Sequence, residues 1–545
     1  MDIALIGRHT AQLRPASEIG AKAANLARMA ANGIPVPPAF VLPVSLCAAI
    51  VRGDHDAKHG LNDALQRGIT FLEEETGRRF GDRRTPLLVS VRSGAARSMP
   101  GMLDTVLDVG CTIDAVHGLI RSTGNPRFVW DCRRRFLESY ADVVLDLDAA
   151  LFKAAKEALI RAENLRDESE LDSEALERLA GHYQELIEDA EASVPANAVA
   201  QLKTAAHAVY RSWTSERAIK YRSLQHLEDL AGTAVTVQAM VFGNRGPRSG
   251  AGVAFSRDPS TGARQPVIDV LFDAQGEDIV SGKSTPENED AIQRLLPEAA
   301  ARLRETLSRL EREFSDVQDI EFTIENGELW ILQSRSAKRT PEAALRFAID
   351  LAEEGLITRA EALRRVGDLD IERLCCNELK DAGEPVASGI GASAGVATGR
   401  VAFDASSAER LAASGEPVIL LRPDTSTADI AGFAISSGIV TAAGGRTAHA
   451  ALVARQLGKP CIVGCKALEI DGAGQRARIA GATIKEGDWL SIDGESGRLY
   501  LGRGNIIVRQ PTEALAKIGA WRAELDQGCS VEANKSASGV LVAVS

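Results

Sequence analysis

The residues best suited to chemistry lie in one glycine-rich stretch, residues 444–455, which reads GGRTAHAALVAR. Its glycines permit a tight turn, and an alanine-rich helix follows whose first amides are free to bind an anion. His449 falls in the first turn of that helix, so a phosphorylated imidazole would lie next to those amides. A histidine that only caps the helix is the alternative. Its position inside the glycine loop favours a phosphate carrier.

A second candidate functional segment, which could bind a polyphosphate, is the stretch 87–105, LLVSVRSGAARSMPGMLDT. A predicted strand carries Arg92, and the small residues after it keep side chains away while Arg97 adds a second cation. Backbone amides and guanidinium groups are what a polyphosphate requires. On its own the loop is weak evidence, because many loops of small residues are only turns. Lys22, in GAKAANL, is a candidate phosphate clamp, for which an ordinary surface lysine is the alternative.

The segment 319–335, DIEFTIENGELWILQSR, alternates polar and apolar residues at its start, as a strand with one buried face does. The alternation places Asp319, Glu321 and Thr323 on one face. The Asn326-Gly327 pair then predicts a hairpin. The carboxylates of this strand are therefore expected to face a second strand that follows directly in the sequence.

The length of the turn decides which residues face each other across this hairpin. A two-residue turn would set Glu321 opposite Leu332, whereas a three-residue loop at 326–328 sets Glu321 opposite Gln333 and Asp319 opposite Arg335. We expect the three-residue loop. It gathers two carboxylates, an amide and a guanidinium on one face, a set of groups that can hold Mg²⁺ and a triphosphate. Taken alone, the hairpin is explained equally well by cross-strand surface pairs.

Several domains must position these segments, since 545 residues correspond to three or four domains of about 150 residues each. Residues 11–339 alternate helical and strand-like segments, which predicts an α+β fold that is mostly helical from 126 to 230. Near its start, Ser17 can cap a helix that runs to about Ala31. Two helical periods at 341–366 and a looser stretch to 385 predict a helical linker.

The remainder of the chain predicts a second compact domain. Residues 388–502 are rich in glycine and in short β runs such as 417–421 and 488–492. One convincing helix is expected there, from about 447 to 457. A further helix at 511–526 precedes a polar tail.

Composition excludes several classes of protein. With 63 basic and 75 acidic side chains the net charge is −12, which argues against binding to nucleic acid or to an anionic membrane. No apolar stretch approaches the roughly 20 residues of a membrane span, and the first residues do not resemble a signal peptide, so we expect a cytoplasmic protein. Eight cysteines without a CxxC motif indicate reduced thiols rather than structural zinc.

Taken together and in order, these segments resemble the pyruvate phosphate dikinase family over residues 1 to about 505. The matching motifs are KAANLARM, SVRSGAARSMPGMLDT, FGNRGPRSGAGVAFSRDPSTG, AQGED, QDIEFTIENGELWILQSR and GGRTAHAALVAR. The resemblance implies an ATP-grasp nucleotide-binding domain at 1–340, with a helical part at about 112–200. After the linker at 341–385, it implies a swivelling β/β/α phosphohistidine domain at 386–505. Residues 506–545 are left as a C-terminal helix and tail.

The resemblance also implies a role for each matching residue. His449 would be the catalytic phosphate carrier, and Thr447 matches a threonine that a regulatory kinase modifies in some members. Asp319, Glu321 and Gln333 would hold Mg²⁺. The ATP-binding residues would be Lys22, Arg92, Arg134, Glu277, Asp319, Glu321, Gln333 and Arg335.

This sequence departs from the family's pattern in three ways. Ala21 stands where a glycine is usual. Arg446 and Ala448 replace the usual methionine and serine around Thr447, which bears on the reactivity and regulation of His449. About 40 residues follow residue 505, whereas the β/α barrel that binds pyruvate in the family needs roughly 200 or more. We therefore expect that barrel on a separate subunit.

The leading hypothesis is a dikinase-type phosphotransferase that carries out part of the reaction. Mg·ATP and phosphate would be used to phosphorylate His449, giving AMP and pyrophosphate, and the phosphoryl group would pass to pyruvate on the separate barrel subunit. Two alternatives stay open. One is transfer to another acceptor, and the other is a non-catalytic ATP-binding protein with a regulatory role.

Overall fold

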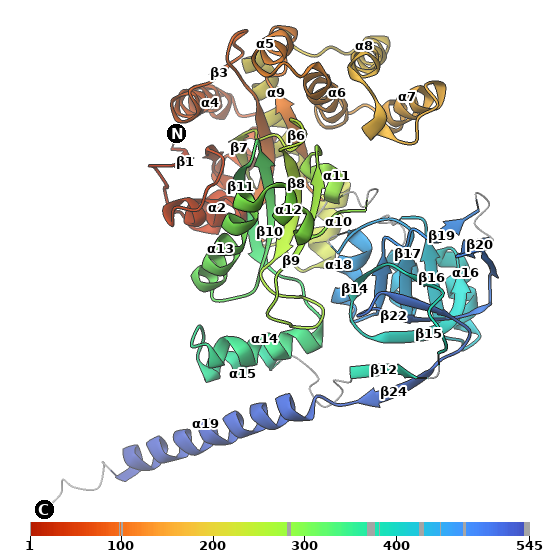
Figure 1. Ribbon diagram of the computed structural model, residues 1–545. Helices are drawn as coiled ribbons and strands as arrows, with labels where there is room; N and C mark the ends of the chain where they lie inside the picture. Colours follow the sequence, from red (N-terminus) through yellow and green to blue (C-terminus); the bar gives the residue numbers. More distant parts are fainter. Residues whose placement is uncertain are drawn as a thin grey trace, which may run out of the picture. The chain divides into compact units, whose positions relative to one another are not determined.

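Figure 1 shows the computed structural model of the chain. The chain divides into two compact units. The first comprises Met1–Gly250 and Phe322–Ser334, and the second comprises Ala251–Glu321 and Arg335–Ser545. The structure describes residues 2–97, 99, 102–280, 285–367, 376–380, 382–424, 430–446, 448–471 and 476–538. Within these residues, no helix combines the length and the apolar character that a membrane crossing requires.

The first unit is built on a five-stranded sheet with the order β1-β2-β7-β5-β6, in which every neighbouring pair is antiparallel. Arg92 of β5 lies opposite Thr236 of β7. The strand expected around Arg92 is thus confirmed, and it lies between β7 and the edge strand β6. The strands are β1 (Ala4–Ile6), β2 (Ala39–Leu42), β5 (Val89–Ala95), β6 (Thr105–Val109) and β7 (Thr233–Ala239), with a small pair β3 (Arg79–Phe80) and β4 (Pro86–Leu87) beside them in the sequence.

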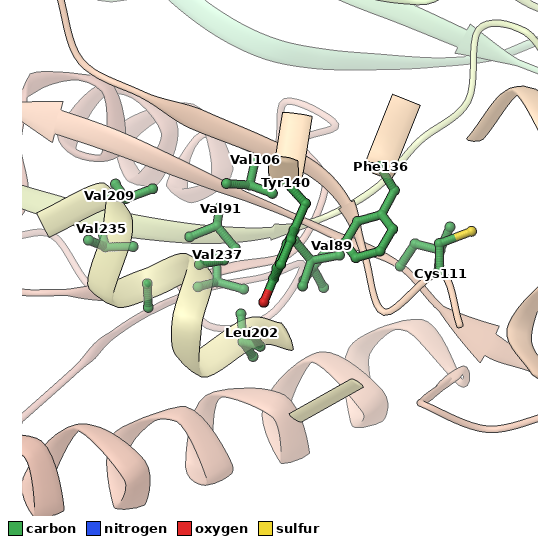
Figure 2. Packing of buried hydrophobic residues seen from close by; sticks show 14 of the residues in the cluster. Val89, Val91, Val106, Cys111, Phe136, Tyr140, Leu202, Val209, Val235 and Val237 are labelled. Carbon is green, nitrogen blue, oxygen red and sulfur yellow. The ribbon is translucent and has the colours of Figure 1, made fainter. Parts of the chain in front are cut away.

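Helices with one apolar face pack on this sheet. In α6, Phe136 and Tyr140 are one turn apart and fully buried, so they present one face of the helix to the strands. Figure 2 shows the Phe136 ring beside Val89 of β5 and the Tyr140 ring between Val89 and Val91, with Leu202 of α9 near the Tyr140 hydroxyl. The mostly helical character predicted for 126–230 is confirmed. The helices are α2 (Ala21–Ala31), α3 (Cys47–Val51), α4 (His55–Thr76), α5 (Ile113–Thr123), α6 (Pro126–Val143), α7 (Ala149–Ala162), α8 (Ser173–Asp189), α9 (Ala198–Arg211) and α10 (Glu216–Leu224), with short 3₁₀ turns η1 (Val44–Leu46), η2 (Glu168–Glu170) and η3 (Ser212–Thr214).

The single helix expected from Ser17 to Ala31 is wrong, because two helices occupy this stretch. The first, α1 (Ala16–Ile19), ends where Gly20 adopts a φ of 79°, and α2 begins at the next residue. A side chain at Gly20 would place its Cβ 2.1 Å from the carbonyl oxygen of Gly94. The break therefore follows from the close approach of the two backbones, which only glycine allows.

A second sheet has four strands in the order β11-β10-β8-β9. The turn between β10 and β11 contains two residues, Asn326 and Gly327, with φ values of 52° and 87°. The three-residue loop that we expected is therefore wrong. Asn-Gly tolerates positive φ at both positions, and the resulting turn matches the twist of a hairpin. The elements are β8 (Gly250–Phe255), β9 (Val267–Phe272), β10 (Gln318–Glu325) and β11 (Glu328–Ser336), with helices α11 (Gly276–Val280), α12 (Glu289–Leu295) and α13 (Pro297–Phe314) between β9 and β10.

The two helical periods predicted at 341–366 are confirmed as α14 (Pro341–Glu353) and α15 (Arg359–Val366). Phe347 of α14 is buried in one apolar cluster with Phe255 and Val317. On its other side, α14 packs against α19 (Thr512–Ser538), whose Ile518 and Trp521 are buried. This segment is therefore packed against the body of the second unit along two sides.

An eight-stranded mixed sheet accounts for the predicted glycine-rich domain, with the order β13-β23-β22-β15-β16-β17-β18-β14. The pairs from β15 to β18 are parallel and the others are antiparallel. The helix expected at about 447–457 is confirmed as α18 (His449–Gln456). The elements of this domain are β13 (Ala387–Ser388), β14 (Ile390–Ser393), β15 (Val396–Ala402), α16 (Ala405–Ala413), β16 (Val418–Arg422), α17 (Ile430–Ile435), β17 (Gly438–Thr441), β18 (Cys461–Val463), β22 (Trp489–Asp493) and β23 (Arg498–Leu501). One small sheet consists of β19 (Leu468–Ile470), β20 (Arg476–Ile479) and β21 (Ala482–Lys485), and another pairs β12 (Cys376–Lys380) with β24 (Asn505–Arg509).

Candidate active site

The start of α2 carries the candidate phosphate clamp of the first unit. Lys22 is exposed in the first turn of α2, two residues after Gly20, which lies against the backbone of Gly94 in β5. Arg92 is half-buried two residues earlier on the same strand. The helix start thus meets the strand that carries the arginine, and the two predicted cations come from elements in direct contact.

Asn25, one turn further along α2, ties this helix to β11. Its Nδ2 donates a hydrogen bond to the carbonyl oxygen of Ser334 at 2.9 Å, directly after the buried Gln333. The helix therefore contacts both strands that carry the predicted residues Arg92 and Gln333. Sequence reasoning missed Asn25 although it lies within KAANLARM, because an amide that bridges two elements has the same local pattern as a surface amide.

Within the second unit, Asp319 and Arg335 form a buried ion pair. The Nε of Arg335 donates to Oδ2 of Asp319 at 2.8 Å, and the Asp319 side chain is only 1% exposed. Burial raises the pKa of the Asp319 carboxyl, against the opposing charge of Arg335, and the nearby Glu321 raises it further. The pairing of Asp319 with Arg335 that we expected is present, although the turn of the hairpin is shorter than predicted.

The second carboxylate oxygen of Asp319 fits a cation. Oδ1 is buried and has no hydrogen-bond partner among the residues that the structure describes, and the half-buried Glu321 lies two residues further along β10. Mg²⁺ takes oxygen ligands and often uses one or two carboxylates together with substrate phosphates. Among the described residues, no group of three or more His, Cys, Asp or Glu side chains forms a metal cage. A Mg²⁺ ion here would therefore share its coordination with a phosphate chain.

Arg134 lies in a network of ion pairs among helices. Its Nη2 is 2.7 Å from Oδ1 of Asp131, its Nη1 is 3.3 Å from Oε2 of Glu138, and its side chain is 4% exposed. Glu168 joins the network and also accepts from Lys156 at 2.6 Å. Carboxylates of the helical part thus pair with the guanidinium group of Arg134. The last predicted ligand, Glu277, is exposed in the first turn of α11 in the second unit.

The predicted phosphate-carrying helix, α18, begins at His449 with Ala448 as its N-cap. The methyl side chain of Ala448 makes no capping hydrogen bond. Amides at a helix N-terminus without an intrahelical acceptor are suited to binding a phosphoryl group. Thr447, the predicted regulatory residue, lies outside the described residues.

Two arginines of the glycine-loop motif have contacts that the sequence did not reveal. Arg455 of α18 is fully buried and donates to the carbonyl oxygens of Ala392 and Arg446 at 3.1 and 2.6 Å. Burial lowers the pKa of Arg455 to about 10, while the charge of Asp319 opposes this shift. The backbone N–H of Arg446 donates to Asp269 at 2.6 Å. The loop before the histidine-bearing helix thus contacts β9, and Arg455 lies close enough to Asp319 for their charges to interact.

Two protein-family models match this chain. The family model described as pyruvate phosphate dikinase, AMP/ATP-binding domain, matches residues 56–295 and 283–355. The model described as PEP-utilising enzyme, mobile domain, matches residues 414–497, which include α18. These two matches cover both the hairpin of Asp319 and the glycine loop.

Curated relatives match over most of this chain. It is 40% identical to pyruvate, phosphate dikinase of Rhizobium meliloti over 518 residues, which is 92% of this chain and 58% of that protein. It is 40% identical to pyruvate, phosphate dikinase of Clostridium symbiosum over 490 residues, 89% of this chain and 56% of that protein. The chain thus spans little more than half the length of the relatives it matches. With the first family model covering more than half of its residues, the chain belongs to the pyruvate phosphate dikinase family.

Proposed function

We propose that this chain uses ATP and phosphate to phosphorylate His449. In the first step the imidazole of His449 attacks the β-phosphorus of ATP, the bond to the α-phosphate oxygen breaks, and AMP leaves. In the second step inorganic phosphate attacks the terminal phosphorus of the pyrophosphorylated histidine. Pyrophosphate leaves, and the histidine keeps a single phosphoryl group.

The observation that carries the proposal is the Asp319–Arg335 pair with its unfilled carboxylate oxygen. A buried carboxylate oxygen without a partner costs stability unless a cation or a donor fills it. Here it lies next to a guanidinium and to Glu321, which is the mixture of charges that a metal-bound polyphosphate complements.

The basic side chains and the oxygen-bearing side chains have different proposed roles. Lys22, Arg92 and Arg335 are proposed to bind phosphate oxygens, so that negative charge developing on the leaving AMP and on the transferred group is stabilised. Asp319, Glu321 and Gln333 would hold Mg²⁺, which neutralises phosphate charge and orients the chain of phosphates. Glu277 remains a proposed ATP contact. The free amides of α18 would stabilise the phosphoryl group on His449.

Pyruvate is proposed to receive the phosphoryl group on a separate barrel subunit, outside residues 1–545. His449 must then reach two remote partners in turn, so the domain at 386–505 is proposed to swivel about the segment 341–385. The binding of nucleotide would favour the orientation in which the histidine faces ATP.

Labelling with ATP carrying radioactive phosphorus at the β position tests the function directly. With Mg²⁺ and phosphate, we expect an acid-labile, base-stable phosphoprotein together with AMP and pyrophosphate. The label should be absent from His449→Ala and present in His182→Ala, a matched control on the exposed face of α8. Absence of label in the unaltered protein under all conditions would instead support a regulatory ATP-binding protein.

A further inference from the structure

The helical part of the first unit contains a cavity that the proposed phosphotransfer does not use. Its volume is about 590 Å³, within the range of about 300–1,000 Å³ that ligand pockets occupy. Helices α5, α6, α8 and α9 line it, together with the segment 194–196 that precedes α9. None of the residues with a proposed role in binding ATP or carrying phosphate lies in its wall.

A buried guanidinium without a carboxylate partner lies in this wall. Arg133 is 7% exposed, and it donates to the carbonyl oxygen of Cys111 at 2.6 Å and to Oε1 of Gln184 at 3.5 Å. Both acceptors are neutral, and burial lowers the pKa of Arg133. Within the described part of the chain, no Asp or Glu forms an ion pair with it.

The next residue on the same helix shows the contrast. Arg134 is 3% exposed, but Asp131, Glu138 and Glu168 surround its guanidinium. A buried charge is costly unless an opposite charge compensates it. At Arg134 the protein supplies that charge, whereas Arg133 lines a cavity with room for an anion from solution.

The remaining wall indicates what kind of anion fits. The half-buried indole of Trp130 and the side chains of Ile113 and Pro195 are apolar and suit a flat organic body. Asp114 and Glu177 also line the cavity and are exposed. Two carboxylates repel a ligand of high negative charge, so a single negative charge is favoured over a polyphosphate or a nucleotide.

We propose that this cavity binds a small aromatic monocarboxylate, with its carboxylate on Arg133 and its ring against Trp130. The site is separate from the phosphate-binding residues, and the proposal stands whether or not His449 carries phosphate.

Gly181 offers a test that leaves Arg133 in place. It lines the cavity from α8, and a Cβ built there has no heavy atom within 4 Å. Gly181→Leu should fill part of the cavity, and it also replaces a poor helix former by a good one. Gly181→Ala is the matched control, since it makes the same improvement to the helix with little added volume.

The experiment uses the full chain and benzoate as the probe, with benzamide as the neutral analogue of the same shape and inorganic phosphate as the anion without a ring. Calorimetry should give benzoate a Kd of about 1 mM or lower, at least tenfold tighter than benzamide or phosphate. Binding should also quench tryptophan fluorescence, and Trp130→Phe should remove the change in signal. Gly181→Leu should weaken benzoate at least tenfold, whereas Gly181→Ala should leave its Kd within a factor of about two.

Arg133→Met completes the set, with circular dichroism and thermal unfolding as checks of its fold. The Arg133→Met variant should have the same weak affinity for benzoate as for benzamide. The proposal is overturned if benzoate binds no more tightly than benzamide or phosphate, or if Gly181→Leu leaves its affinity unchanged. Absence of benzoate binding up to about 10 mM would overturn it equally.

Discussion

Removal of one negative charge from the helical part should destabilise the protein by a predictable amount. Glu168, in η2, lies 2.6 Å from Nζ of Lys156 and 3.9 Å from Nη2 of Arg134, and its side chain is 29% exposed. Glu168→Gln keeps the shape of the side chain but removes its charge. The two buried cations would then lose a shared partner, so the folded state should lose stability at neutral pH.

The pKa of Glu168 gives the size of the effect. Burial acts to raise this pKa, but Arg134 and Lys156 outweigh it and lower the value from 4.5 to about 2. At about 1.4 kcal/mol per unit, the shift corresponds to stabilisation on the order of 3 kcal/mol. Because the folded-state pKa is the lower one, this stabilisation is complete above pH 4.5 and is lost as the pH falls towards 2. The substitution should therefore cost most at pH 7 and almost nothing at pH 2.

Urea unfolding at pH 7, 4 and 2.5, followed by circular dichroism, measures this dependence. The matched control is Glu157→Gln on α7, where Lys153 and Arg161 lie 3.9 and 3.8 Å away on the surface. Exposed pairs of this kind contribute about 0–1 kcal/mol, so the control should change little. Equal effects of the two substitutions at pH 7 would refute the reasoning, as would a loss in Glu168→Gln that persists undiminished at pH 2.5.

Four other outcomes follow from the same structure. Arg335→Ala should weaken Mg·ATP at least tenfold in calorimetry, about 1.4 kcal/mol, because a charge-assisted phosphate contact is lost. Gly20→Ala should lower the unfolding midpoint and weaken Mg·ATP, since its Cβ would meet the carbonyl of Gly94. Arg134→Met should destabilise the fold because its ion pairs are lost, and a large rise in the Kd for Mg·ATP would support the predicted role of Arg134 as an ATP ligand, whereas an unchanged Kd would contradict it. Small-angle scattering should differ with and without a Mg·ATP analogue, and superimposable profiles would contradict the proposed swivel.

Elements with strong local signals were predictable from the sequence. The helix that starts at His449 follows a glycine loop, and the strand of Arg92 is a short apolar run, so each is marked by its own residues. The hairpin turn is instructive, because Asn326-Gly327 is the pair that favours a two-residue turn. We instead expected the three-residue loop, because it aligned the charged residues across the strands. The preference of Asn-Gly for a two-residue turn determined the structure.

Features that depend on distant partners were not predictable. The end of α1 at Gly20 is set by the backbone of Gly94, which lies 74 positions later in the numbering. The burial of Arg455 and the network around Arg134 likewise depend on other elements. An arginine on a helix has the same sequence signature whether water, a carboxylate or a carbonyl oxygen surrounds it. Motif resemblance could name candidate site residues, but it could not predict the groups that pack around them.

The long C-terminal helix has a practical consequence for anyone who divides this chain for expression. Ile518 and Trp521 of α19 complete the apolar cover of α14, and Lys517 and Glu524 form ion pairs with Glu353 and Arg359. A fragment that stops at residue 505 would expose that apolar surface to water, and exposed apolar patches promote aggregation. It would also remove most of β24, the antiparallel partner of β12. A cut placed beyond residue 526 should therefore yield more soluble protein than one placed at the apparent end of the glycine-rich domain.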